Sequence, residues 1–339
     1  MVFVTGGTGL LGSHLLIQLL KRGKSVRALK RPTSDLNKVK NVFDFYLKNE
    51  SVDLFNKIEW VDGDITDVTS LPLLLDECDT IYHCAGYVSF YRKDFKKLMK
   101  INKEGTANLI NTSLSLGIKN FSYVSSTAAI GRDKRGTEYT EKSKWVTSPA
   151  NSNYAVSKHS GEMEVWRGQE EGLNTSIVNP CVILGAGVWD EGSLTLFKNV
   201  ANGLKFYTEG INAFVDVRDV AFCMVELIEQ QVFSQRFLVT SENVCFRDLF
   251  FMIADALKIK RPSIKVKPWL ANLAWRIEAI KSFLTFSKPK ITKETSRSAM
   301  SISRYSNAKI STQLNHRFIP IKDSVKNAIE FQSFIKTRT

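Results

Sequence analysis

Apolar and polar positions follow two distinct rhythms along the first half of the chain. Compact, mainly apolar runs predict β-strands at residues 2–5, 25–30, 57–61, 79–84, 120–125 and 175–178. Apolar residues spaced three or four apart predict helices at 10–22, 95–116 and 153–171. Strands and helices that alternate in this way predict the α/β class, with a doubly wound parallel sheet that carries helices on both faces.

Beyond about residue 185 the alternation loosens, and we expect a smaller second lobe to begin there. One segment of it, KPWLANLAWRIEAIKSFLTF at 267–286, has a helical pattern. Its apolar positions are Trp269, Leu270, Leu273, Ala274, Trp275, Ile277, Ile280, Phe283 and Leu284. Its surrounding cations are Lys267, Arg276, Lys281 and Lys288. Two interpretations are open. The helix lies on an anionic membrane surface, or it packs on the lobe with its basic face in solvent. We favour packing, because such a stripe more often belongs to a core.

Positive charge is concentrated in the same region. The chain carries a net charge of +13, and residues 258–309 hold 13 Lys or Arg against two acids, Glu278 and Glu294. This segment alone therefore carries +11. Such a patch suits nucleic acid, anionic lipid or an acidic ligand. Because the chain contains no recognised nucleic-acid-binding motif, we do not expect nucleic acid as a partner.

The composition is that of a globular protein, with 43% hydrophobic and 24% charged residues. No apolar run approaches the roughly 20 residues that span a bilayer, and glycine follows the first strand too soon for a signal peptide. The five cysteines are scattered without a CxxC pair, which predicts reduced thiols in the cytoplasm. The four histidines lack metal-ligand spacing, so we expect no metal site.

Glycines cluster between the first strand and the first helix. Gly7-x-Gly9-x-x-Gly12, preceded by Gly6, fits the dinucleotide-binding fingerprint in its proper strand-to-helix context. Bare backbone there lets N–H groups approach a pyrophosphate, and the helix N-terminus attracts its negative charge. The alternative is a purely structural turn, which four glycines in this context make less attractive.

The end of the second strand indicates which dinucleotide binds. An NAD site usually has an acid about 20 residues after the glycines, bonded to the ribose 2′-hydroxyl. Here the strand ends in Lys30-Arg31-Pro32, and Asp35 comes only after the turn. Because cations suit a 2′-phosphate, we favour NADP, with NAD left open. An ordinary solvated strand end is the alternative for Lys30 and Arg31.

A second group of residues has the chemistry of proton transfer. Ser125-Ser126-Thr127 follow a strand, and Tyr154-x-x-x-Lys158 opens a helix, where positions four apart share a face. A lysine ammonium beside a tyrosine stabilises the phenolate and lowers the tyrosine pKa, as does a positively charged nicotinamide. YxxxK alone is a weak signal, and its value here lies in its order after the glycine loop and the Ser/Thr strand end.

Together these motifs resemble the extended short-chain dehydrogenase/reductase family, also described as the NAD(P)-dependent epimerase/dehydratase superfamily. The resemblance covers about residues 1–225 and rests on TGGTGLLG (5–12), DGDI (62–65), HCAG (83–86), NKEGT (102–106), VSSTAAIG (124–131), YAVSK (154–158), NPCVILGAG (179–187) and FVDVRDVA (214–221). It implies a Rossmann-type NAD(P)-binding domain over 1–185, with returns to it at about 214–240, and a mainly substrate-binding lobe over 186–339.

The resemblance also implies roles for individual residues. Tyr154 would be the general acid/base, Lys158 would lower its pKa, and Thr127, with Ser126 as the fallback, would hold the reacting oxygen. Asn102 would support the proton relay. The cofactor would be bound by Gly6, Gly9, Leu10, Leu11, Gly12, Lys30, Arg31, Asp64, Ile65, Ala85, Gly86, Ser125, Tyr154, Lys158, Pro180 and Val182. Substrate contacts would come from loops near 87–92, 132–150 and 186–210.

Two departures from the family pattern narrow the chemistry. Nucleotide-sugar members usually carry arginines where this chain has Asn179 and Asn212, which weakens the case for a diphosphate substrate. The strand tip VRALKRP is instead closest in type to dihydroflavonol-reductase-like enzymes, which prefer NADP. We therefore expect an NADP-dependent oxidoreductase acting on a carbonyl or secondary alcohol of a non-nucleotide small molecule.

Other functions remain open. One is an NAD-dependent nucleotide-sugar epimerase or dehydratase, which would use the same tyrosine and lysine. Another is a non-catalytic NADP-sensing protein, which the presence of both Tyr154 and Lys158 disfavours. A homodimer is also open, because many relatives pair through helices that correspond to 95–116 and 153–171, whereas others are monomers.

Overall fold

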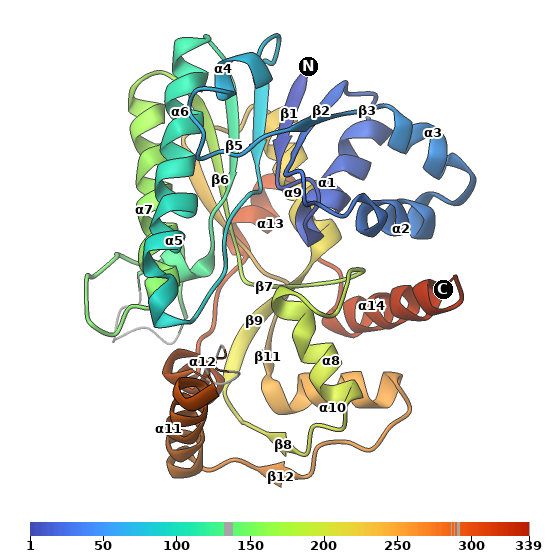
Figure 1. The fold of residues 1–339 in the computed structure, drawn as a ribbon, viewed down its shortest axis with the longest axis vertical. Coiled ribbons are helices and arrows are strands. Elements are labelled where there is room, and N and C mark those ends of the chain that lie inside the picture. The colour runs from blue at the N-terminus through green and yellow to red at the C-terminus, as the bar shows by residue number, and fades with distance from the viewer. Residues whose placement is uncertain (132–137, 286, 288, 290–291, 339) are drawn as a thin grey trace.

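A single large parallel sheet forms the centre of the protein. The computed structural model describes residues 1–131, 138–285, 287, 289 and 292–338. Seven strands form this sheet in the order β10-β6-β5-β4-β1-β2-β3, every neighbouring pair parallel (Figure 1). They are β1 Val2–Thr5, β2 Val26–Lys30, β3 Ile58–Asp62, β4 Thr80–His83, β5 Asn120–Val124, β6 Asn174–Pro180 and β10 Gln235–Val239. The predicted α/β fold with a doubly wound sheet is confirmed.

The strand order reverses beside β1. From β1 the chain winds outward through β2 and β3, and it then crosses back to place β4, β5 and β6 on the other side. Because the strands are parallel, their carboxyl ends share one edge of the sheet, and the loops after β1 and β4 diverge there. Such a switch point leaves a crevice in which ligands of α/β proteins bind.

Helices cover both faces of the sheet. The first half of the chain contributes α1 Leu10–Lys21, α2 Leu36–Leu47, α3 Ser51–Asn56, α4 Leu71–Leu74, α5 Phe95–Met99, α6 Gly105–Ser115 and α7 Asn153–Glu170. The second half contributes α8 Thr195–Ala201, α9 Val217–Glu229, α10 Phe246–Ala256, α11 Pro268–Thr285, α12 Lys293–Met300, α13 Ala308–Leu314 and α14 Ile321–Lys336.

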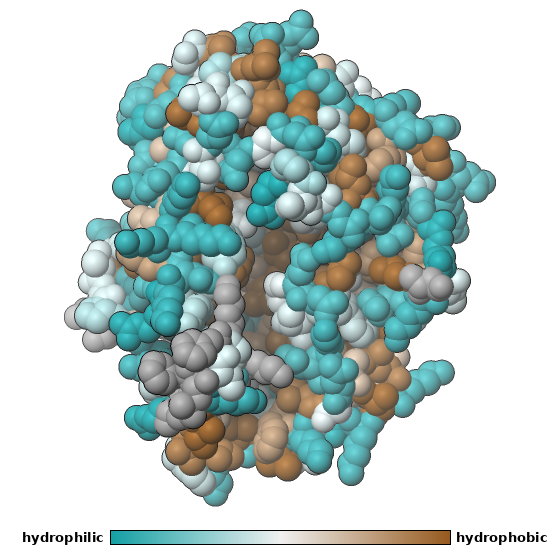
Figure 2. Space-filling model, viewed as in Figure 1, coloured by the Kyte–Doolittle hydropathy of each residue, from teal (hydrophilic) through white to brown (hydrophobic). Residues whose placement is uncertain are grey.

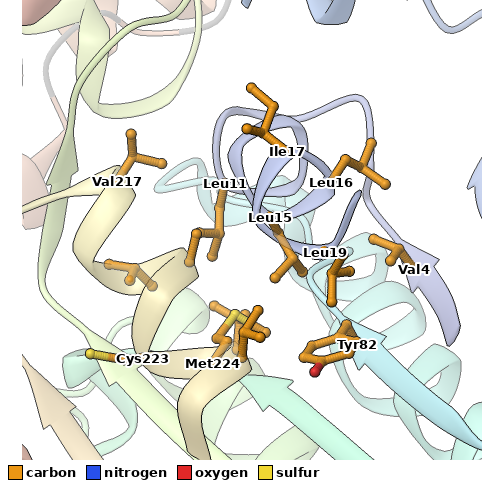
Figure 3. Close-up of a cluster of buried hydrophobic side chains, with 14 of the residues drawn as sticks. Val4, Leu11, Leu15, Leu16, Ile17, Leu19, Tyr82, Val217, Cys223 and Met224 are labelled. Atoms are coloured by element: carbon orange, nitrogen blue, oxygen red, sulfur yellow. The ribbon is translucent and has the colours of Figure 1, made fainter. Parts of the chain in front are cut away.

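Two buried apolar layers hold these helices to the sheet. On one face, Leu15 and Leu19 of α1 point toward Met224 of α9 and toward Val4 and Tyr82 of the sheet (Figure 3). On the other face, side chains of α6 and α7 pack on β4, β5 and β6. Each fully buried Leu or Val stabilises the fold by roughly 1.5–3 kcal/mol. Both layers reach the carboxyl edge, where Val124 at the end of β5 belongs to the first and Ile65 after β3 belongs to the second.

The remaining elements form the lower lobe in Figure 1. It contains a small sheet in the order β11-β9-β7, built from β11 Glu242–Cys245, β9 Ile211–Asp216 and β7 Val182–Leu184, and the pair β12 Ile264–Lys265 with β8 Phe206–Tyr207. A separate apolar cluster that includes Phe197, Phe214 and Leu249 fills this lobe. Among the described residues, no helix has both the length and the apolar character that crossing a membrane requires.

The predicted elements agree with the structure except in a few places. The predicted helix 95–116 is interrupted by a π-helical turn, Lys100–Glu104, between α5 and α6. Helices α2, α3 and α4 were not predicted, nor were most of the elements that follow β6. Some predictions fall on residues outside the described ones. Residues 132–137 belong to the predicted substrate loop 132–150, and residue 286 ends the predicted helix 267–286. The side chains of Ile280, Phe283, Leu284 and Lys288 also lie outside the described part.

Candidate active site

The carboxyl edge of the sheet gathers the predicted cofactor residues. Each strand from β1 to β6 has some of them at its end or just after it, because strand ends of a parallel sheet share one edge. They are Gly6 to Gly12 after β1, Lys30 and Arg31 at β2, Asp64 and Ile65 after β3, Ala85 and Gly86 after β4, Ser125 after β5, Pro180 at the end of β6, and Val182 at the start of β7. The face shown in Figure 2 is hollowed at its centre, with an apolar floor.

The glycine turn leaves no room for side chains. Gly6 has a left-handed φ of +70°, and a Cβ there would lie 2.6 Å from the Ala85 backbone nitrogen. A Cβ on Gly12 would collide with the Gly6 carbonyl oxygen, which already accepts a hydrogen bond from the Gly9 N–H (3.0 Å). Gly9 is exposed and precedes Leu10 and Leu11, the first residues of α1. A helix N-terminus with bare backbone suits a pyrophosphate, so these residues fit a dinucleotide.

At the tip of β2 the two predicted cations differ. The Lys30 ammonium pairs with Asp62 of β3 at 2.6 Å, whereas the Arg31 side chain is exposed. Asp35 does not take the position of a ribose-binding acid, because its carboxylate caps α2 and accepts the Asn37 N–H at 2.9 Å. Of the two cations at this tip, Arg31 is therefore the one whose side chain faces solvent.

The two residues predicted to border the adenine face different ways. Asp64 is exposed, and its carboxylate accepts hydrogen bonds from the Thr66 backbone and hydroxyl. The Ile65 side chain is buried and lies where a Cβ on Gly105 would be, so it points into the core. Ile65 can thus offer a ligand its backbone only.

Tyr154 stands at the start of α7, which Ser152 caps by accepting the Ala155 N–H. Burial raises the pKa of Tyr154, and a hydrogen bond with the Ser126 hydroxyl opposes that rise. Sequence reasoning prefers Thr127 as the hydroxyl beside the reacting oxygen. Thr127 is buried at the start of the one-turn helix Thr127–Ala129, and Ser126, just before it, is the hydroxyl that lowers the Tyr154 pKa.

Lys158 lies one helical turn beyond Tyr154 and is buried. Its ammonium donates to the Val124 carbonyl oxygen at 2.7 Å and stands 4.8 Å above the Tyr123 ring. A Cβ on Gly86 would lie 3.6 Å from it, so the loop after β4 passes close by. Burial lowers the pKa of Lys158 to about 8, and the negative charge of Glu162 works against that shift.

Asn102 links the loop after β4 to α7 through hydrogen bonds. Its side-chain oxygen accepts the Tyr87 N–H at 2.7 Å, and its amide donates to the Tyr87 carbonyl and to the Ser157 hydroxyl, both at 2.9 Å. Asn102 sits in the π-helical turn, a feature often found at functional sites. α7 approaches this turn closely because residue 161 is glycine, where a Cβ would collide with the Asn102 carbonyl.

Sequence reasoning missed a buried carboxylate below Lys158. Glu162 has no exposed surface and accepts hydrogen bonds from Ser125 (2.5 Å), Asn179 (2.7 Å) and Arg236 (3.1 Å). Arg236 comes from β10, far away in sequence. The available signal was position, because Glu162 follows Lys158 by one helical turn on the face that packs against the sheet.

The structure does not support the use of Asn179 as a sign against a diphosphate substrate. Its side chain is fully buried, and its amide donates to Glu162 and to the Ser126 carbonyl oxygen. A side chain at this position cannot reach a ligand in the crevice without rearrangement. The asparagine therefore says nothing about a diphosphate substrate. Its role is to hold the strand end that carries Ser126.

The sequence profile of the NAD dependent epimerase/dehydratase family matches residues 2–239, which is most of the chain. The chain belongs to this family. It is accordingly an NAD(P)-dependent enzyme of the oxidoreductase type. The glycine turn and the strand ends described above all lie within the residues that the family profile covers.

Three proteins are similar to this chain over most of its length. A Synechocystis sp. protein provisionally named a dihydroflavonol 4-reductase is 27% identical, covering 99% of this chain and 96% of its own. "Sterol demethylase protein B" of Methylococcus capsulatus is 28% identical, covering 79% of this chain and 77% of its own. The crystal structure of gox2253 is 28% identical, with a TM-score of 0.80 over 98% of both chains.

The charge on Glu162 gives this family member a testable pH dependence. Glu162 raises the pKa of Lys158 against the effect of burial, so Glu162→Gln is expected to lower that pKa further. The ammonium is then lost at lower pH, and the decline of coenzyme affinity with rising pH should move down by about one unit. Fluorescence titration of NADPH across pH measures this.

Trp166→Phe is the matched control. It removes the 3.4 Å indole hydrogen bond to Glu162 and leaves the charge in place, so the decline should stay where it is in the wild type. Equal shifts in both variants would mean that Glu162 acts through packing and not through its charge.

Proposed function

We propose that the protein is an NADP-dependent oxidoreductase that reduces a ketone or aldehyde, or oxidises a secondary alcohol, on a non-nucleotide small molecule. The observation that carries the coenzyme assignment is the tip of β2, where Arg31 is exposed and Asp35 is engaged in capping α2. A guanidinium binds a phosphate through charge-assisted hydrogen bonds. All five cysteines carry free thiols, which supports a cytoplasmic setting for this activity.

The side chains around Tyr154 supply the proton chemistry. The bound coenzyme would deliver or accept a hydride at the substrate carbon. In reduction, the Tyr154 hydroxyl donates its proton to the carbonyl oxygen, and in oxidation its phenolate accepts the alcohol proton. Thr127 would hold the reacting oxygen, or Ser126, the hydroxyl that lowers the Tyr154 pKa, would do so instead. The ammonium of Lys158 stabilises the phenolate, and Asn102 holds the loop that frames the site.

An apolar wall beside Tyr154 supports an apolar substrate. The Phe90 ring meets the Tyr154 ring edge to face, with centroids 5.8 Å apart, and both Phe90 and Val88 are exposed on the loop after β4. A substrate whose oxygen reaches Tyr154 would place its neighbouring carbons against Phe90. The similar proteins named for a dihydroflavonol and a sterol support the same class, because both names denote ring systems with large apolar surfaces.

Replacing Arg31 by alanine tests the coenzyme assignment. A charge-assisted bond to the 2′-phosphate contributes about 1.5–3 kcal/mol, so NADPH affinity should fall by roughly 10- to 100-fold. NADH, which lacks this phosphate, should bind as it does to the wild type. Lys57→Ala, an exposed cation at the opposite edge of the sheet, is the control and should change neither affinity. Equal losses for both coenzymes would count against NADP.

A substrate panel tests the reaction. NADPH oxidation is followed with ketones and aldehydes of increasing apolar surface, beside UDP- and dTDP-sugars. Turnover of carbonyl compounds with release of NADP supports the proposal. Conversion of a nucleotide sugar with tightly held NAD would support the alternative instead, an epimerase or dehydratase, to which the family description also points.

A further inference from the structure

The outward face of α11 is apolar. Trp269, Leu273 and Ile277 are 64%, 44% and 57% exposed, although all three are large hydrophobic residues. Residues four apart lie on the same side of a helix, so these three form one continuous stripe. The interpretation that the sequence favours, with the apolar stripe packed into the lobe, is wrong for these three side chains.

The opposite face of α11 makes the contacts that hold it. There Ala271 and Ala274 are half-buried and Ser282 is buried. Helix α12 packs against this face, and the Ser296 hydroxyl donates to the Ala271 carbonyl oxygen at 3.2 Å. This face of the helix is therefore anchored in part through small residues, while Trp269, Leu273 and Ile277 point away from the protein.

The neighbouring strands extend this apolar surface. Phe206 of β8 and Ile264 of β12 are paired residues of the separate two-stranded β8–β12 sheet and are 46% and 44% exposed. In Figure 1 β8, β12 and α11 share the foot of the molecule, and Figure 2 shows hydrophobic side chains gathered there. We call these five residues, Phe206, Ile264, Trp269, Leu273 and Ile277, the foot surface.

Exposed cations lie on α11 and on the chain that leads to it. These are Lys258, Lys260, Lys267, Arg276 and Lys281. They belong to residues 258–309, which carry +11 in total. Two further cations here are already paired, Arg261 with Asp255 and Lys265 with Glu209, so the five exposed ones come in addition to these pairs.

We propose that the foot surface docks the enzyme on an anionic lipid bilayer. Trp269, Leu273 and Ile277 would enter the boundary between headgroups and acyl chains, with α11 parallel to the membrane, while the cations meet anionic headgroups. Charge favours this occupant over a second copy of the chain, because two segments of +11 would repel each other. The proposal is independent of the coenzyme and of the substrate.

Vesicle co-sedimentation of the full-length protein tests the proposal. We expect binding to phosphatidylcholine vesicles that contain phosphatidylglycerol, much weaker binding to phosphatidylcholine alone, and release as salt is raised. The double substitution Leu273→Gln and Ile277→Gln keeps the charge and removes apolar contact, so it should weaken binding about tenfold or more. NADPH binding should remain unchanged, because the foot surface is remote from the glycine turn.

The matched control is the double substitution Val52→Gln and Leu73→Gln. These residues are 64% and 80% exposed on α3 and α4, and acids stand close to each in the sequence (Glu50 and Asp53; Asp76 and Glu77), so the control should bind vesicles like the wild type. Three results would overturn the proposal. The wild type fails to bind anionic vesicles at low salt, or both double variants lose binding equally. In the third, sedimentation shows that the wild type self-associates through this face and leaves vesicles unbound.

Discussion

Replacing Tyr154 by phenylalanine is expected to lower turnover by about 10²- to 10⁴-fold. The variant keeps the ring that packs edge to face on Phe90 and loses the hydroxyl that bonds Ser126. The proton that the reduced oxygen must receive then lacks its donor. The glycine turn and the β2 tip are untouched, so NADPH affinity should stay close to that of the wild type.

The measurement pairs steady-state NADPH oxidation with equilibrium NADPH binding. Tyr87→Phe is the matched control, because it removes a hydroxyl on the loop next to the site, where it donates to Asp94 at 2.8 Å. That variant should retain most of the activity. If Tyr154→Phe turned over substrate like the wild type, Tyr154 would not be the acid/base. If it kept full physiological activity with coenzyme bound, the non-catalytic NADP-sensing function would be favoured.

The elements that position the coenzyme were predictable because their signals are local. Strands in a buried parallel sheet are short apolar runs, and a glycine fingerprint between a strand and a helix fixes where the first crevice loop begins. Because all strands of the sheet are parallel, their carboxyl ends lie at the same edge. Arg31, Gly86 and Ser125 were therefore expected near one another although they are far apart in sequence.

The layer beneath the catalytic side chains was not predictable in the same way. Glu162 looks like a polar residue on an amphipathic helix, and the partners that make its burial tolerable come from the sheet, Ser125 just after β5, Asn179 of β6 and Arg236 of β10. The π-helical turn at Asn102 likewise depends on tertiary partners, the Tyr87 backbone and Ser157. Such networks join residues 15 to 74 positions apart, so no local pattern reports them.

The spacing of apolar residues also could not predict whether a side chain points into the core or toward solvent. A stripe at 269, 273 and 277 tells that these residues share a side of the helix, but the same pattern fits a core and an exposed surface. The preference between Thr127 and Ser126 has the same origin. The two hydroxyls are adjacent in sequence, and the conformation of one short turn decides which of them meets Tyr154.

Alanine at Gly12 is expected to damage the fold itself, whereas alanine at Gly9 should damage only coenzyme binding. A Cβ on Gly12 would lie 2.7 Å from the Gly7 Cα and closer still to the Gly6 carbonyl oxygen, and both are backbone atoms that no rotamer change can move. A Cβ on Gly9 would meet one atom within 4 Å, the Gly6 carbonyl oxygen at 3.3 Å, and would otherwise project into the open crevice.

Overpacking against backbone costs about 3 kcal/mol, so Gly12→Ala should lower the free energy of unfolding by about that amount and abolish NADPH binding as the turn shifts. Gly9→Ala should unfold nearly like the wild type and bind NADPH at least about tenfold more weakly, because its methyl group occupies the approach to the helix N-terminus. Denaturant unfolding and NADPH titration on both variants separate the two roles. Equal stability of the two variants would show that the turn absorbs a Cβ at Gly12, and an undiminished affinity in Gly9→Ala would place the pyrophosphate away from the start of α1.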